Sequence, residues 1–215
     1  MSRYLGLASL TLAGLLVQAH AAADDLGGFV DLRLGYATLG TEYSTEYDNV
    51  DTDDDWDTAH RINLDWVGSL GLSRSGGVLW GIGGSWQHDQ GQLPNDEDTT
   101  FQYWIARGHI GYGLPIGNHL QLELLPYVGF GKSYLDIESD AEGFGGGDGA
   151  DALWEIGVNL NVVYTWDSGF QMGLQGGYYF YETSIETDLE DGAGRNRYRF
   201  ETFSPNIGFF VGARL

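Results

Sequence analysis

The sequence predicts an all-β protein, an eight-stranded antiparallel up-and-down transmembrane β-barrel that is preceded by a cleavable signal peptide. Three observations support this prediction. Apolar and polar residues alternate along eight runs of the chain, the connections between the runs are alternately long and short, and most tryptophans lie on the apolar face. A period of two is typical of a β-strand, and an even number of strands with long loops at one end is the plan of a membrane barrel.

Residues 1–23 have the composition of a secretory signal peptide. A basic start leads into an uncharged apolar run of about 13 residues, and small residues follow it. That order is typical of a signal peptide, and the run is too short to span a bilayer as a helix. Both Ala21 and Ala23 satisfy the small-residue cleavage pattern. We therefore expect cleavage after Ala21 or Ala23, and a barrel formed by residues 24–215.

Eight runs with period two are expected to form the strands. They lie at residues 28–37, 60–73, 78–89, 101–114, 119–135, 152–166, 170–183 and 198–215. The long connections between them lie at 38–59, 90–100, 136–151 and 184–197. The short connections are rich in Gly, Asn, Asp and Ser, which is the chemistry of tight hairpin turns. Consecutive antiparallel hairpins need no crossover helix.

The positions of the aromatic residues indicate which face of the strands contacts lipid. Near the long-loop end lie Trp86, Trp104, Trp154 and Phe180, and near the short-turn end lie Trp80, Tyr112, Trp166 and Phe170. Two aromatic belts that flank an apolar band are typical of lipid interfaces. From Trp154 to Trp166 a tilted strand rises roughly 30 Å, which is close to the thickness of such a band. The apolar face is therefore expected to point outward.

The polar face carries a balanced set of charges at mid-strand. Its members are Asp31, Asp65, Glu123 and Glu155 against Arg33, Arg61, Arg107 and Arg214, together with His109. This balance stands out in a chain with 31 acidic and 10 basic residues. Guanidinium groups bind carboxylates bidentately, so the pattern favours a buried, paired network that fills the lumen. Asp31 and Arg214 are expected to pair where the last strand meets the first.

Most of the acidic residues lie in the long-loop regions, which contain 23 of the 31 when Asp89 and Glu182 at their edges are included. The formal net charge of −21 argues against nucleic acid as a partner. One loop contains Asp51, Asp53, Asp55 and Asp57, which resembles half of a calcium-binding loop. The required glycine and final glutamate are missing, so a weak cation-binding loop and a solvated acidic loop both remain open. We expect no dedicated metal site and no cofactor.

The C-terminal run completes the pattern. In Asn206–Leu215 the apolar residues Ile207, Phe209, Val211, Ala213 and Leu215 alternate up to the last position, although that position is not aromatic. Over about residues 24–215 the chain resembles the small outer-membrane barrels of the OmpA-barrel and OmpX type. The resemblance implies insertion by the outer-membrane assembly machinery, periplasmic termini and extracellular long loops. It also implies contact with outer-membrane lipids and lipopolysaccharide, for which Mg²⁺ or Ca²⁺ would form bridges to the acidic loops.

Two functions of different classes are compatible with this plan. One is a structural and surface-interaction scaffold with a plugged lumen, and the other is a small or gated channel that favours cations. A more remote alternative is an enzyme that modifies lipid A, because some small outer-membrane barrels are deacylases or acyltransferases. Such chemistry needs a serine, a histidine base and an acid. The pair His109 and Glu123, about one diagonal step apart on neighbouring strands, has no serine beside it, so no enzymatic activity is expected.

Overall fold

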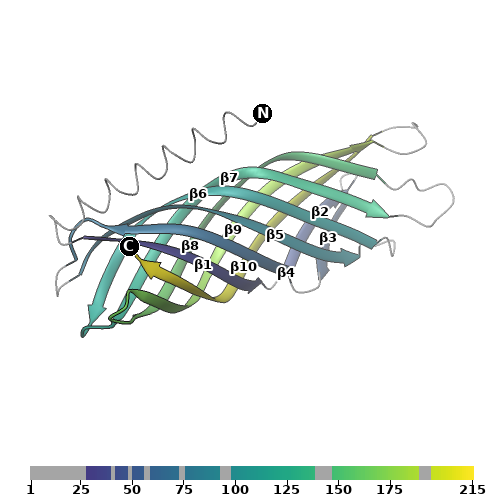
Figure 1. Cartoon of the computed structure of the whole chain (residues 1–215). Coiled ribbons are helices and arrows are strands. Elements are labelled where there is room, and N and C mark those ends of the chain that lie inside the picture. The colour runs from purple at the N-terminus through teal and green to yellow at the C-terminus, as the bar shows by residue number, and fades with distance from the viewer. Residues whose placement is uncertain are drawn as a thin grey trace, which may run out of the picture.

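Eight antiparallel strands form a closed barrel in which each strand pairs with the next and the last pairs with the first (Figure 1). The computed structural model describes residues 28–39, 42–47, 50–55, 59–72, 76–92, 98–138, 147–188 and 195–215. The barrel strands are β1 (Phe29–Leu39), β4 (Ala59–Ser69), β5 (Gly77–Gln92), β6 (Asp98–Ile116), β7 (Leu120–Glu138), β8 (Gly147–Thr165), β9 (Phe170–Asp188) and β10 (Arg195–Arg214). The predicted all-β, eight-stranded up-and-down barrel is confirmed, while the expected signal peptide lies outside the described residues.

The two ends of the barrel differ. At the short-turn end, β6 joins β7 and β8 joins β9 through tight turns in which Gly117 and Gly169 have φ of 72° and 82°. Glycine adopts this left-handed region without steric cost, which explains its use there. The opposite end, from which the longer connections leave, is called the long-loop end below. Among the described residues, no helix is long and apolar enough to cross a membrane.

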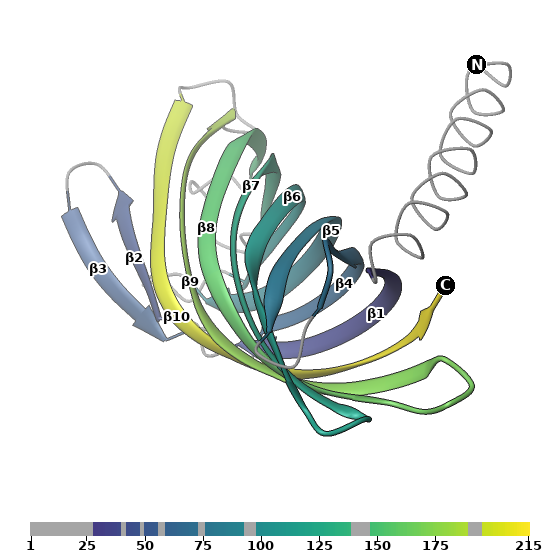
Figure 2. The same ribbon diagram turned by 90° about the vertical axis from the view of Figure 1, so that its left-hand side faces the viewer.

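A hairpin that the sequence did not predict lies at the long-loop end. Residues 38–59 were expected to form a loop, but β2 (Glu42–Tyr47) and β3 (Val50–Asp55) pair with each other. β2 also pairs with β10, along Tyr198–Glu201. Figure 2 shows the hairpin beside β10, where it extends the sheet at this end. This arrangement is possible because β1 is short, so the far part of β10 has no partner from β1.

Pro205 lies where β10 changes partner. The pairing of β10 with β1 ends at Asn206, and its pairing with β2 begins at Glu201. Proline has no backbone N–H to donate and is accepted at unpaired edges of a sheet. The alternation continues through this point, since Phe203 is exposed while Ser204 and Asn206 are buried. The proline therefore occupies the part of β10 that needs no donor on that side.

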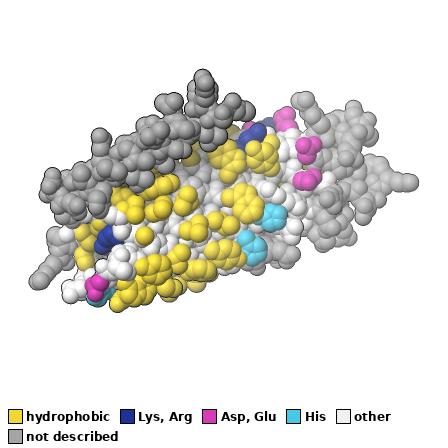
Figure 3. Space-filling model, in the orientation of Figure 1, with side chains coloured by type: hydrophobic (Ala, Val, Ile, Leu, Met, Phe, Trp, Pro, Cys, Tyr) yellow, Lys and Arg dark blue, Asp and Glu magenta, His cyan; other side chains and the backbone are white. Residues whose placement is uncertain are grey.

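The strands place apolar side chains outward and polar side chains inward. On β8, Leu160 is 55% exposed, whereas the neighbouring Asn159 and Asn161 are buried. The face in Figure 3 carries hydrophobic side chains along its middle and acidic ones toward both ends. A barrel in water would have the opposite arrangement, because exposed apolar surface is unfavourable there. The outward band therefore fits a lipid surround, and the lumen holds the polar groups that could act as a site.

Candidate functional site

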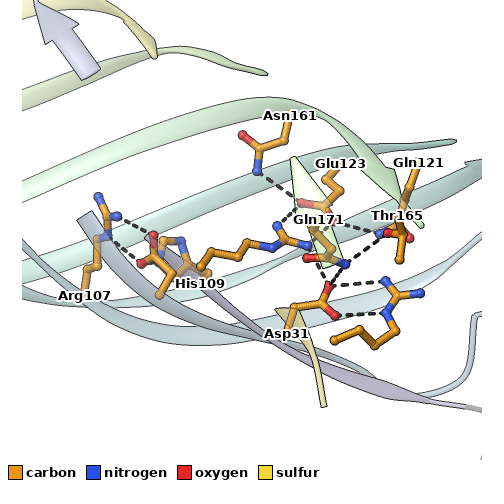
Figure 4. Close-up of polar contacts among 11 residues, drawn as sticks. Asp31, Arg107, His109, Gln121, Glu123, Asn161, Thr165 and Gln171 are labelled. Atoms are coloured by element: carbon orange, nitrogen blue, oxygen red, sulfur yellow. Dashed lines mark hydrogen bonds and ion pairs between the residues drawn. The ribbon is translucent and has the colours of Figure 1, made fainter. Parts of the chain in front are cut away.

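A network of hydrogen bonds and ion pairs around Asp31 lies in the lumen near the short-turn end. This buried carboxylate accepts a hydrogen bond from Arg33 Nη2 at 2.9 Å and another from Gln171 Nε2 at 2.9 Å (Figure 4). Arg214 Nε donates to its other oxygen, also at 2.9 Å. Asp31 and Arg214 face each other in the β1–β10 ladder. The ion pair expected at the closing seam is thus present.

A second carboxylate, Glu123, holds the same guanidinium from across the lumen. Arg33 Nη1 and Nη2 donate to the two oxygens of Glu123 at 2.6 and 2.7 Å. Gln121 and Asn161 donate to the same carboxylate at 2.8 and 3.1 Å. Arg33 belongs to β1 and Glu123 to β7, so this bidentate contact spans the barrel instead of following one ladder. The contact therefore crosses the lumen from β1 to β7.

A middle layer is centred on Asp65. Arg107 Nη2 and Nε lie 2.7 and 3.1 Å from its carboxylate oxygens, and His109 Nε2 lies 3.2 Å away. These residues reach over β5 at Gly83, where any added Cβ would collide with the Asp65 carboxylate. The prediction that His109 and Glu123 lie one diagonal step apart was wrong. In the β6–β7 register Tyr127 stands opposite His109, whereas Glu123 stands opposite Gly113, four residues further along β6. His109 therefore belongs to the polar network of Asp65 and Arg107.

A third layer, called the upper layer because it lies nearest the long-loop end, joins Arg61 to Glu155. Their ion pair is bidentate, with N–O distances of 2.8 and 3.0 Å, and Gln87 Oε1 accepts from the same guanidinium at 2.7 and 3.0 Å. Tyr127 donates to Glu155 at 2.6 Å. The Tyr103 hydroxyl lies 2.8 Å from Glu155 and also accepts from Arg61. Each charge in this layer is thus compensated by several partners, as burial requires.

Above the upper layer the lumen becomes apolar, which the sequence analysis did not anticipate. Arg61 lies 4.5 Å from the ring centroid of Tyr179, and the Tyr179 ring stacks on Tyr181. Beyond these rings a buried cluster fills the long-loop end of the barrel: Leu39, Ala59, Phe101, Leu135, Ile137, Leu153, Ile185, Tyr198 and Phe200. A smaller apolar cluster of Phe29, Val67, Leu79 and Leu125 lies at the short-turn end. Three polar layers thus lie between two apolar clusters along the lumen, and a small cavity lined by Asn63, Asn159, Asn161 and Gln175, among others, remains beside the middle layer.

All nine lumen residues named from the sequence are brought together in these layers, and the structure adds members that sequence reasoning missed. One addition is a buried acid, Asp89, which accepts a hydrogen bond from Gln87 Nε2 at 2.8 Å. The others are amides: Gln87, Gln121, Asn161 and Gln171. Their inward register was the signal that could have identified them. They complete the hydrogen bonding of carboxylates that one guanidinium cannot saturate.

The outward-facing aromatic residues lie toward the two ends of the barrel strands, as the sequence predicts for two aromatic belts. At the long-loop end Trp86 stands opposite Trp104 in the β5–β6 ladder, and Trp154 contacts Phe180 at 5.3 Å between ring centroids. At the short-turn end the Trp166 and Phe170 rings lie 5.2 Å apart. Tyr112 is 47% exposed, and Trp80 is partly exposed. Their outward positions are those of interface side chains.

The acidic loop gives no metal centre within the described part of the chain. Asp51, Asp53 and Asp55 lie in the backbone of β3, but their side chains and all of Asp57 lie outside the described residues. Within that part no group of three or more His, Asp or Glu side chains is placed to hold a metal ion. Cation binding by this loop stays a prediction.

No family model matches the sequence, and no curated protein matches it. Solved structures with the same architecture were found. The outer membrane protein OprG from Pseudomonas aeruginosa is 16% identical, with a TM-score of 0.55 over 86% of this chain and 95% of that one. A major outer membrane protein from Thermus thermophilus is 9% identical, with a TM-score of 0.61 over 87% of this chain and 99% of that one. The chain has the fold of the small outer-membrane β-barrels. At these identities the likeness establishes the fold alone.

The fold does not decide whether this outer-membrane barrel has enzymatic activity. The outer membrane protease OmpT from Escherichia coli is also similar, at 6% identity and a TM-score of 0.48 over 87% of this chain and 96% of that one, which is too distant to carry an argument. The absence of activity therefore stays a prediction from the sequence.

Proposed function

We propose that this chain is an integral outer-membrane protein that acts as a scaffold with a closed lumen and holds its acidic loops outside the cell. The ion pairs that cross the lumen support the proposal. Asp31, Arg33 and Glu123 close the short-turn end, and Arg61 with Glu155 closes the barrel further up. Buried ion pairs of this kind resist rearrangement, because a charge that loses its partner remains in a poorly solvated site.

In this proposal the short-turn end and both termini face the periplasm, and the long loops face outward. The support is the length of the connections, because outer-membrane barrels combine short periplasmic turns with longer extracellular loops. The loops carry most of the 31 acidic residues, so divalent cations would join them to the anionic lipopolysaccharide around them. The apolar outward face between the aromatic belts anchors the barrel in the bilayer, so it keeps the acidic loops at a fixed distance above the membrane.

Conductance measurements in planar bilayers test the closed lumen. The purified barrel, inserted into phosphatidylcholine bilayers, is expected to give no steady current, because the layers leave no continuous column of water. Arg107→Ala and Glu123→Ala each remove one partner of a layer and serve as comparison variants. A steady conductance of the wild-type barrel that favours cations, and that these substitutions alter, would contradict the scaffold function and indicate a small cation channel.

A further inference from the structure

Two histidines lie opposite each other on the outward face of the barrel, toward the long-loop end. His60 of β4 is exposed, His88 of β5 is half-buried, and the two are partners in the β4–β5 ladder. Their neighbours in the same row are the uncharged residues Thr38 of β1 and Gln102 of β6. Figure 3 shows histidine side chains side by side at the edge of the hydrophobic band. Because both imidazoles point outward, neither takes part in the lumen network.

Each imidazole is held against an aromatic ring of the next row toward the membrane. His60 stacks on Tyr36 with ring centroids 5.9 Å apart, and His88 stacks on Trp86 at 5.8 Å. Tyr36 and Trp86 both stand opposite Ile62 in their ladders, so they form one row, which includes a member of the aromatic belt. The histidines therefore lie one row beyond the belt, at the level where water and ions reach the barrel. Because stacking already orders the rings, a ligand that binds them has less side-chain freedom to remove.

Both histidines have a ring nitrogen whose electron pair a ligand can use. His60 Nδ1 and the Tyr36 hydroxyl oxygen lie 2.7 Å apart. In the tautomer with the proton on Nδ1, His60 donates to the hydroxyl and Nε2 keeps its electron pair, which is how metal-binding histidines are usually oriented. His88 Nδ1 is enclosed and has no hydrogen-bond partner among the described groups. An enclosed polar atom without a partner is unfavourable, so a ligand that binds it lowers the free energy.

The chemistry of the pair selects a transition-metal ion. Imidazole nitrogen suits Zn²⁺, Ni²⁺ and Cu²⁺, whereas Mg²⁺ and Ca²⁺ prefer oxygen ligands. Residues opposite each other in an antiparallel ladder have Cβ atoms about 4.5–5.5 Å apart, so two imidazoles can converge on one ion at about 2 Å from each nitrogen. The formal net charge of −21 attracts cations to the surface. Among the described side chains no third His, Asp or Glu completes a cluster, so water would fill the remaining positions and the ion would exchange.

We propose that His60 and His88 bind one divalent transition-metal ion, Cu²⁺ or Zn²⁺, on the outward rim of the barrel. The bound ion links β4 to β5 beside the aromatic belt. This site departs from the expectation of no dedicated metal site, because the two histidines are far apart in the sequence and the ladder register places them opposite each other. It requires neither a closed lumen nor a given end outside the cell, so it and the proposed function can fail separately.

The test titrates the purified barrel, without a histidine tag and in dodecylphosphocholine micelles, with Cu²⁺ and records electron paramagnetic resonance spectra. The wild type is expected to bind one ion whose spectrum shows two imidazole nitrogens as ligands. His60→Gln and His88→Gln should each weaken binding about a hundredfold, the lower end of the gain that two linked contacts give over one. His119→Gln is the matched control, because His119 is also partly exposed and stacks on an aromatic ring, that of Tyr164 at 5.6 Å, but no described pairing places a histidine opposite it.

Three outcomes would overturn the proposal. Unchanged Cu²⁺ binding in His60→Gln and His88→Gln would mean that the pair is not the site. A wild-type spectrum with oxygen ligands alone would assign the ion to the acidic loops. Equal loss in His119→Gln would mean that single imidazoles bind ions independently of the pair. Heat-modifiable gel mobility is measured first for every protein, and if one substitution at the pair prevents folding, the other still decides the result.

Discussion

The Asp31 carboxylate and the Arg214 guanidinium lie 2.9 Å apart, although 183 positions separate them in the chain. They join the first barrel strand to the last at the seam where the barrel closes. The same carboxylate also accepts hydrogen bonds from Arg33 and Gln171, so one acid has two guanidinium groups and one amide as donors. Asp31 therefore links the seam of the barrel to the lumen network that includes Glu123.

Asp31→Asn is expected to destabilise the barrel by about 3 kcal/mol, at the lower end of the cost of breaking a buried ion pair, because Arg33 keeps Glu123. Urea unfolding in lipid vesicles, followed by tryptophan fluorescence, measures the change. Asp167→Asn provides the control, since Asp167 is exposed in a turn. Equal stability of Asp31→Asn and the wild type would show that the seam does not depend on this pair.

A double-mutant cycle on Arg61 and Glu155 measures the upper layer. Each single substitution to Met should cost about 3–5 kcal/mol, because it leaves one buried charge without its partner, whereas the double variant should cost much less than the sum. The exposed pair Arg199 and Glu182 is the comparison, with a coupling of about 1 kcal/mol or less. Additive losses at Arg61 and Glu155 would contradict the role given to this layer.

Strand positions and side-chain faces could be predicted from the sequence because a period of two fixes both at once. Asp31 and Arg214 could also be paired, since the seam joins the ends of the chain in a barrel of even strand number. The contacts of Arg33 with Glu123 and of Arg61 with Glu155 could not, because they join strands that are not neighbours. Such contacts depend on the stagger of the whole barrel, which no single run of sequence encodes.

The apolar upper lumen was missed for a different reason. At Phe101 and Leu135 the inward residues are apolar while their neighbours Gln102 and Asp136 are polar, which reverses the polarity found at mid-strand. A rule that places every apolar residue against lipid therefore fails at this level. At the long-loop end the strands also extend beyond the predicted runs, for example from Ala152 back to Gly147 on β8 and from Thr183 on to Asp188 on β9.

Leu160→Arg on β8 tests which surface meets lipid. Leu160 is 55% exposed and lies midway between Trp154 and Trp166, so an arginine there should destabilise the inserted barrel by about 2–4 kcal/mol. Ala150→Arg, on the same face of the same strand but beyond the belt, should cost about 0–1 kcal/mol. The measurement is reversible unfolding in vesicles. A cost that is the same at both positions would place the bilayer elsewhere.

Single cysteines at the two ends of the barrel test its orientation, and the chain has no cysteine of its own. Asp148→Cys lies near the long-loop end and Asp167→Cys lies in a short turn. In intact cells a membrane-impermeant maleimide should label the first and spare the second, while both react after lysis. Labelling of Asp167→Cys alone in intact cells would reverse the proposed topology.

The hairpin beside β10 has a consequence for how this protein tolerates change. Tyr198–Glu201 pairs with β9 on one side and with β2 on the other, because β1 ends before it reaches them. Without β2 those four residues would present unpaired N–H and C=O groups, and such an edge is a template for strand exchange with a second molecule. Among the described pairings the hairpin moves the open edge from β10 to β3, whose sequence Val50–Asp55 contains four aspartates, and charged residues on an edge strand disfavour pairing with a second molecule.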